Sequence, residues 1–166
     1  MSIIDIPGSL FPVSAAPVCD TDGAVTLDAI SVKEAQMVYL YIHLYQAVGH
    51  ATAITPLCGT AVASTAVALP EKVEIWYGLT TTSTVALAKQ SDAKLFTVDV
   101  GAVGQIHLIF KIDPAILQAT GTAYDCLGGT IASSAQATNL VSAVWLIQPR
   151  HANAPASNVA TRFIAD

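Results

Sequence analysis

The feature that most constrains this chain is a strict alternation of side chains between Val38 and Tyr45. One set of alternate positions is aliphatic: Val38, Leu40, Ile42 and Leu44. The other set carries three tyrosines and a histidine: Tyr39, Tyr41, His43 and Tyr45. A period of two places successive side chains on opposite faces of a β-strand. The segment therefore predicts a strand with one face in a core and an aromatic second face.

Similar short segments recur along the chain and are separated by glycine or proline. The predicted strands are 24–30, 37–46, 51–58, 63–69, 72–77, 84–88, 95–100, 105–112, 130–133 and 142–148. Many short strands with regularly spaced turns are typical of antiparallel sandwiches and barrels. We therefore expect an all-β fold, an antiparallel β-sandwich or a jelly-roll-like barrel, with one short helix.

The short helix is expected after Asp113. This aspartate can cap the helix, Pro114 suits the first helical position, and Gly121 can end it. A second short helix over 32–36 is suggested by Ser31 and Glu34, which have the spacing of a capping box.

The length of 166 residues favours one domain. Residues 1–23 are rich in turn-forming residues and predict an extended N-terminal arm or a loosely packed first strand. Residues 24–148 form the single β domain. Residues 149–166, which contain two prolines and two asparagines, predict a C-terminal tail lying on a surface.

The composition is unusually poor in charge. Asp, Glu, Lys and Arg make up 11% of the residues, against roughly 25% in ordinary soluble domains. Because charge keeps free proteins apart, such a chain is expected either in a membrane or in an assembly. The two long uncharged intervals, 35–70 and 126–149, contain glycine, proline and polar residues and are not the apolar stretches of a membrane helix. The start, MSIIDIPGSL, lacks the basic region of a secretory signal. An assembly is the better explanation.

The charge pattern argues against nucleic-acid binding, since the net charge is −5 and the seven Lys and Arg residues are scattered. The three cysteines, Cys19, Cys58 and Cys126, are far apart and are expected to be buried thiols in a reducing compartment.

No pattern of residues indicates catalysis. SDAK, at 91–94, matches the bare SxxK motif of serine acylases, but the partner motifs of that class are missing. The four histidines, His43, His50, His107 and His151, lack metal-binding spacing. If the strands that carry His43 and His107 pair, both rings could share one face. We expect no enzyme activity, no metal and no cofactor.

The aromatic face of 39–45 has three possible explanations. The tyrosines could pack beneath loops of the same chain, form a subunit contact, or present a carbohydrate platform. The polar groups that bind sugar hydroxyls are few here, because only Gln36 and Gln46 lie close by. All three explanations remain open at the level of sequence.

Three runs resemble a known group of proteins: DAISVKEAQMVYLYIHLYQAVG, FKIDPAILQATGTAYDCLGGTI and SAVWLIQPRHANAP. They are similar in texture to small virion proteins of tailed bacteriophages, in particular to auxiliary capsid proteins that decorate or cement the head shell. The resemblance covers about residues 24–155 and rests on charge-poor strands rich in Ala, Thr, Ser and Val, a proline-rich start and a tail rich in proline and asparagine.

The resemblance implies a structural protein of the virion head, assembled in the host cytoplasm, that stabilises a capsid through β-sandwich oligomers. Its partners would be the major capsid protein and copies of itself, possibly as a trimer, with no nucleic acid and no membrane. The expected assembly contacts are Tyr39, Tyr41, His43, Tyr45, Trp76, Arg150 and Phe163. The alternatives are another phage component, such as a tail, adaptor or fibre protein, and a carbohydrate-binding module.

Overall fold

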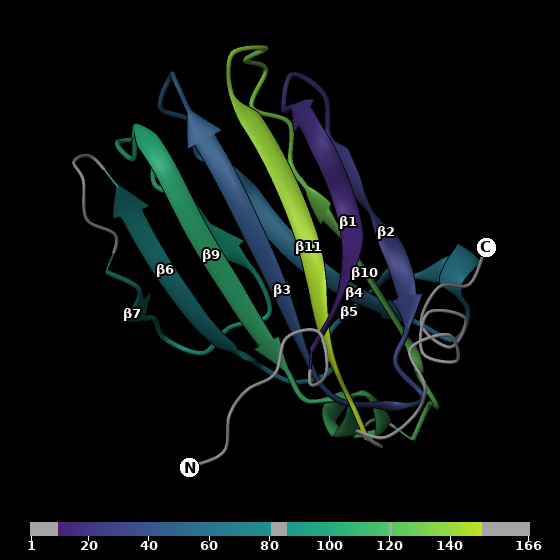
Figure 1. The fold of residues 1–166 in the computed structure, drawn as a ribbon. Coiled ribbons are helices and arrows are strands. Elements are labelled where there is room, and N and C mark those ends of the chain that lie inside the picture. Colours follow the sequence, from purple (N-terminus) through teal and green to yellow (C-terminus); the bar gives the residue numbers. More distant parts are fainter. Residues whose placement is uncertain (1–9, 81–85, 120, 151–166) are drawn as a thin grey trace.

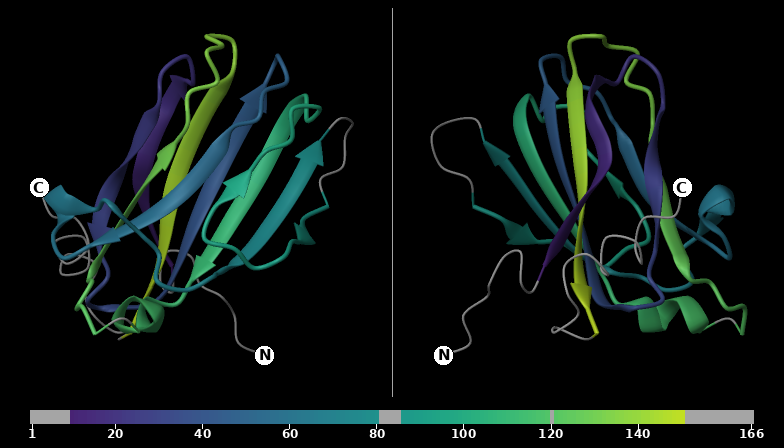
Figure 2. Two further views of the ribbon diagram at one scale, coloured as in Figure 1. Left: turned by 180° about the vertical axis from the view of Figure 1, so that it is seen from behind. Right: turned by 45° about the vertical axis from the view of Figure 1, so that its right-hand side comes forward.

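The computed structural model describes residues 10–80, 86–119 and 121–150 as an antiparallel β-sandwich. Figure 1 shows the larger sheet in front of the smaller one, and Figure 2 shows the two layers from behind and from the side. The all-β sandwich predicted from the sequence is confirmed. The two sheets stay open, so the fold is not a closed barrel.

The larger sheet, sheet A, has the strand order β1-β11-β3-β9-β6-β7. Its strands are β1 (Phe11–Asp20), β3 (Ala35–Gln46), β6 (Glu74–Thr80), β7 (Ala88–Lys89), β9 (Gly104–Ile112) and β11 (Leu140–Pro149). Sheet B has the order β2-β10-β4-β5, and β8 also pairs with β4. Its strands are β2 (Val25–Ser31), β4 (Ala53–Gly59), β5 (Val67–Ala68), β8 (Phe96–Thr97) and β10 (Cys126–Ile131).

The core lies between the sheets and contains the aliphatic positions that alternation predicted. The inward side chains of β3 are fully buried, as are those of the neighbouring strands β9 and β11. Trp145 on β11 is the largest fully buried side chain, and its indole N–H donates to the backbone oxygen of Asp28 on β2 at 2.8 Å. This hydrogen bond joins the two sheets.

The N-terminal segment was expected to be either an extended arm or a first strand, and its described part forms a strand. Residues 11–20 form β1, the edge strand of sheet A, which pairs with β11. Pro12 and Pro17 and two irregularities in the register interrupt this edge. Prolines and bulges on an edge strand discourage pairing with further strands. The predicted arm within 1–9 and the predicted tail from 151 onward lie outside the described residues.

The predicted short helix is present as a 3-10 helix, η2 (Pro114–Gln118). Asp113 caps it as expected, because its carboxylate accepts a hydrogen bond from the backbone N–H of Ala115 at 2.9 Å. The second short helix, over 32–36, was wrong. Ser31 belongs to β2 and β3 begins at Ala35, while the backbone N–H of Val32 donates to the oxygen of Asp125.

Several predicted strands differ from the structure. Of the strand expected at 95–100, only the two-residue β8 (Phe96–Thr97) forms. Residues 63–69 were expected as one strand but form part of a second 3-10 helix, η1 (Val62–Ser64), and the two-residue β5. The strand expected at 130–133 lies earlier, because β10 runs through Gly128 and Gly129. Part of the strand expected at 84–88 lies outside the described residues. No helix among the described residues is long and apolar enough to cross a membrane.

A buried polar network closes one end of the sandwich. Thr21, Ser134 and Asn139 are fully buried, and the hydroxyls of Thr21 and Ser134 lie 2.6 Å apart. The side chain of Asn139 pairs with the backbone of Val48 through two hydrogen bonds of 3.0 and 2.9 Å. Because every member has a partner, the network ties together three connections between the sheets without an unpaired buried group.

Candidate interaction face

The outward side of sheet A, which we call the outer face, is the candidate functional site. It consists of the side chains of β1, β11, β3, β9 and β6 that alternate with the core positions. In Figure 1 the outer face is turned toward the reader, and no described element crosses in front of it. Antiparallel register arranges its side chains in rows across the sheet.

Two of these rows carry most of the aromatic and aliphatic surface. The central row runs across five strands through Ser14, Val144, Tyr41, Ile109 and Trp76. The adjacent row runs through Pro12, Leu146, Tyr39, Lys111 and Glu74. The register thus brings Trp76 into line with Tyr41, which the sequence alone could not show.

A third row contains two histidines directly opposite each other. His43 on β3 pairs with His107 on β9, and their rings stack with centroids 4.9 Å apart and planes 20° apart. The Tyr41 hydroxyl lies 2.7 Å from Nδ1 of His107. Burial, and then the neighbouring His43, lower the pKa of His107. The strands that carry His43 and His107 therefore pair, and both rings share the outer face.

Among the described residues, no group of three or more His, Cys, Asp or Glu side chains could hold a metal ion. His50 lies in the loop between β3 and β4 and does not pair with either His43 or His107 across the sheet. His151 lies outside the described residues. His43 and His107 are both half-buried on the outer face.

Charge is distributed unevenly over sheet A. Strands β11 and β3 carry no Asp, Glu, Lys or Arg, and β1 carries only Asp20 at its end. The remaining charges of the sheet are Lys111 on β9, Glu74 on β6 and Lys89 on β7. The outer face is therefore an uncharged aromatic area bordered by a charged strip at the β6–β7 side.

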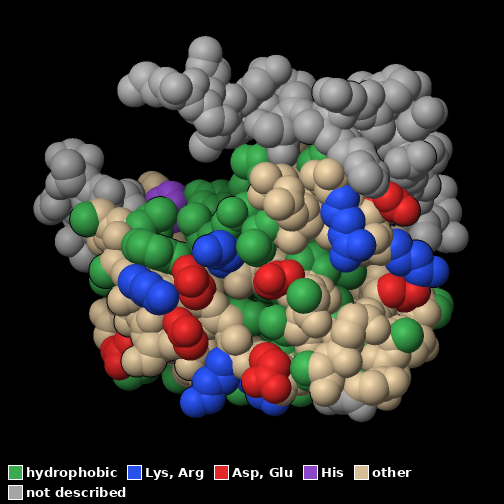
Figure 3. Space-filling model, turned by 90° about the horizontal axis from the view of Figure 1, so that it is seen from below, with side chains coloured by type: hydrophobic (Ala, Val, Ile, Leu, Met, Phe, Trp, Pro, Cys, Tyr) green, Lys and Arg blue, Asp and Glu red, His purple; other side chains and the backbone are tan. Residues whose placement is uncertain are grey.

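The charged strip forms a ladder of ion pairs. Glu74 lies 3.6 Å from Lys111 and 3.7 Å from Lys89, which in turn lies 3.7 Å from Asp92. These side chains are 36–50% exposed, so each pair stabilises the fold by only about 0–1 kcal/mol. Viewed from below, acidic and basic side chains lie side by side on the surface (Figure 3).

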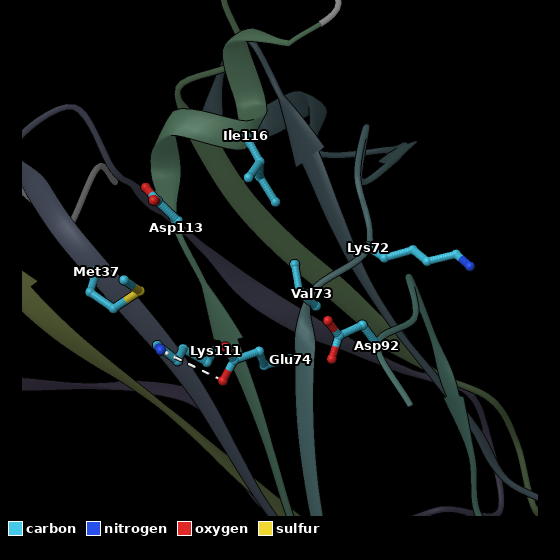
Figure 4. Close-up of a pocket in the computed structure, with 8 residues that line it drawn as sticks. All are labelled: Met37, Lys72, Val73, Glu74, Asp92, Lys111, Asp113 and Ile116. Atoms are coloured by element: carbon cyan, nitrogen blue, oxygen red, sulfur yellow. Dashed lines mark ion pairs between the residues drawn. The ribbon is translucent and has the colours of Figure 1, made fainter. Parts of the chain in front are cut away.

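A pocket of about 300 Å³ adjoins this strip, between β6, β9 and η2. Figure 4 shows Lys111 directed at Glu74, while Lys72 extends away from that pair. The lining residues are Met37, Lys72, Val73, Glu74, Asp92, Lys111, Asp113 and Ile116. Since Lys111, Glu74 and Asp92 all belong to the ladder of ion pairs, their charges are already matched within the chain. The pocket offers no set of converging groups aimed at a ligand.

The predicted contact residues fall into three groups. Tyr39, Tyr41 and His43 are half-buried on the outer face, and Tyr45 is 42% exposed at its edge. Trp76 shares the central row. Arg150 is exposed just beyond β11, where its Nε donates to the backbone oxygen of Ala35 at 3.0 Å. Phe163 lies outside the described residues.

One surface was missed by sequence reasoning. Val48, Val100 and Val103 lie on connecting loops and are 46, 62 and 48% exposed, close to the exposed Tyr45 and Leu140. Gly49 joins two of these loops, because it packs directly against the backbone of Val100. Valines in loops give no periodic signal, and only the fold brings them to one end of the sandwich.

The thiols and the SxxK serine show no arrangement for chemistry. Cys58 and Cys126 are buried, Cys19 is half-buried, and all three are free. Burial raises the pKa of the Cys126 thiol to about 12, and the adjacent Asp125 carboxylate adds to this shift. Ser91 is exposed on a loop, and the ammonium of Lys94 donates to the backbone oxygen of Pro70 at 2.5 Å. The pKa of Cys126 holds this thiol in its unreactive protonated form.

No protein-family model and no curated protein matches the chain. The geometry of the outer face and the resemblance of its sequence to auxiliary capsid proteins are the two indications of function.

Proposed function

We propose that the protein is a structural assembly protein whose copies associate through the outer face and decorate the head of a bacteriophage. The observation that supports this most strongly is the uncharged aromatic area formed by β1, β11, β3 and the part of β9 that precedes Lys111. The centres of protein interfaces are depleted in charged residues and enriched in tyrosine and tryptophan, and their rims are polar. The outer face has this composition, with the β6–β7 ladder as one rim.

The size of the face suits such a contact. Four strands spaced about 4.8 Å apart, each about ten residues long at roughly 3.3 Å per residue, cover about 600 Å². A stable interface buries about 800 Å² on each partner. The outer face supplies most of this area, and the apolar loop end around Val48 and Val100 adjoins it through Tyr45 and Leu140.

A second copy of the chain is the occupant that fits best. A face without charge needs no oppositely charged partner, so it can be complementary to itself. Closed symmetric oligomers, in which the same surface is used by every copy, are the commonest form of protein assembly. On a shell, many weakly bound copies also add their contacts together.

The resemblance to auxiliary capsid proteins is the reason for proposing the capsid as the site of assembly. Under this proposal the major capsid protein is the second partner and the protein resides in the virion head. Pairing of the outer face with itself gives a two-fold dimer, so the trimer implied by the resemblance requires a second contact between copies. A tail, adaptor or fibre protein of the same particle is the alternative role. Co-sedimentation with empty capsid shells separates these roles, since only a decoration protein is expected to pellet with shells that lack a tail.

Placing a charge in the middle of the outer face tests the proposal. Val144→Glu introduces a carboxylate beside Tyr41 without removing a core side chain. Self-association measured by sedimentation is expected to weaken by about a hundredfold or more, because a buried charge without a partner costs several kcal/mol.

The matched control is Thr26→Glu, an exposed position on the outward side of sheet B. Thr26→Glu adds the same charge and should associate as strongly as the unaltered protein. Both variants should keep the far-ultraviolet spectrum of the unaltered protein. Equal association of Val144→Glu and Thr26→Glu would contradict the use of the outer face. Specific binding to a glycan array that is lost in Val144→Glu would assign the face to carbohydrate instead.

A further inference from the structure

The stacked His43–His107 pair lies on the outer face where β3 pairs with β9, on the side of the uncharged area nearest to β6. His43 is flanked in its row by Ser142 on β11, and His107 is flanked by Gly78 on β6. The Nε2 atom of His43 is enclosed and has no hydrogen-bond partner among the described residues. His107 has the Tyr41 hydroxyl as its partner. Neither ring therefore has an acidic hydrogen-bond partner among the described residues.

Among the residues that the structure describes, no acidic side chain on the strands beside the pair is close enough to stabilise an imidazolium. On the strands that contact the pair, the titratable and charged outward groups are Tyr39, Tyr41 and Tyr45 on β3, Lys111 on β9 and Glu74 on β6, with none on β11. Glu74 lies two rows away and is shared by Lys111 and Lys89. Protonation would thus place two like charges at a ring separation of 4.9 Å without a counter-charge.

The lowered pKa of His107 agrees with this environment, since burial and the neighbouring His43 both oppose its charged form. A histidine whose pKa is lowered on folding binds fewer protons than in the unfolded chain. Above the ordinary pKa of 6.5 the histidine is neutral in both the folded and the unfolded chain, so it does not reduce the stability of the fold there. Stability falls as the pH drops below that value and through the lowered pKa.

We propose that the His43–His107 pair acts as a pH switch for self-association through the outer face. The inference rests on the proposed function, because it concerns the same surface. Because burial lowers the pKa of His107, this ring is neutral at neutral pH and can be buried against a second copy. As the pH falls through that lowered pKa, the imidazole becomes charged, and burying it without a counter-charge opposes association.

The experiment compares self-association of the full chain at about pH 7.5 and about pH 5 at equal ionic strength. Sedimentation is expected to show a dissociation constant at least about tenfold higher at the lower pH, the effect of one unit of pKa difference. The far-ultraviolet spectrum should stay unchanged, and raising the pH again should restore the oligomer. Dissociation that accompanies loss of the folded spectrum would overturn the switch.

The matched variant is His43→Gln with His107→Gln, which keeps polar side chains in both positions but cannot become charged. It is expected to associate at both pH values with little change in affinity. The single variant His43→Gln leaves the Tyr41–His107 contact in place and should lose about half of the pH dependence on a logarithmic scale. If the double variant fails to fold, the single variant decides.

The outcomes separate the two proposals. Failure of the unaltered chain to associate at about pH 7.5 would remove the proposed function together with the switch. Association of equal strength at both pH values would overturn the switch alone. A pH dependence that persists undiminished in the single or the double variant would assign it to other groups and also overturn the switch.

Discussion

Trp145→Ala is expected to lower the free energy of unfolding by about 3–5 kcal/mol, the range for removing a buried tryptophan. Trp145 is fully buried between the sheets, and its indole N–H donates to the backbone oxygen of Asp28. The substitution leaves a cavity and an unpaired carbonyl together. Since domains of this size have a total stability of about 5–15 kcal/mol, guanidinium unfolding followed by circular dichroism will show the loss clearly.

Trp145→Phe separates the two contributions. The phenyl ring fills most of the space but cannot donate a hydrogen bond, so the expected loss is about 1–3 kcal/mol, the cost of an unpaired buried group. A loss for Trp145→Ala below about 1 kcal/mol, the average for point mutations at any position, would contradict the central packing role of this side chain.

Gly59→Ala is expected to destabilise the protein by about 2–3 kcal/mol through crowding. A Cβ atom at Gly59 would lie 2.2 Å from the backbone oxygen of Ser64, 2.8 Å from its carbonyl carbon and 2.9 Å from Cα of Thr65. All three are backbone atoms, which cannot rotate away. The segment that contains η1 would have to move off sheet B, and thermal unfolding should show a lower midpoint.

Gly23→Ala is the matched control, because a Cβ atom there meets nothing within 4 Å and its φ is not in the left-handed region. Its expected change is within about 0.5 kcal/mol of zero or slightly stabilising. Equal effects of the two substitutions would show that the close contact at Gly59 does not determine stability.

Alternation predicted the central strands well because each has one face in the core. The strand expected at 37–46 is β3, and those expected at 105–112 and 142–148 are β9 and β11, each with boundaries within two residues. Asp113 and Pro114 likewise located η2. In these segments the local signal and the tertiary environment agree, so the sequence was sufficient.

The strand prediction failed where a glycine allows two segments to pack closely and does not form a turn. Gly128 and Gly129 were interpreted as punctuation, yet both lie inside β10 and are buried. A Cβ atom at Gly128 would lie 2.4 Å from the hydroxyl oxygen of Thr65. A glycine within a strand often marks such an approach of another segment. Nothing near Gly128 in the sequence reveals that residues 62–65 will fold over it.

The composition of the candidate site was predictable, whereas its geometry was not. Alternation assigned the three tyrosines and His43 to one face of a strand. Register, which depends on all the neighbouring strands together, placed His107 against His43 and Trp76 in the row of Tyr41. The uncharged area becomes visible only when β1, β11 and β3 lie side by side, because their sequences are far apart in the chain.

The most direct test of the central claim is the solution mass of the unaltered protein at neutral pH, measured by sedimentation equilibrium over a range of concentrations. Self-association through the outer face predicts a mass that is a whole multiple of 17.2 kDa and that falls toward the monomer on dilution. A mass of one chain at the highest concentration would contradict the claim that this face binds a second copy.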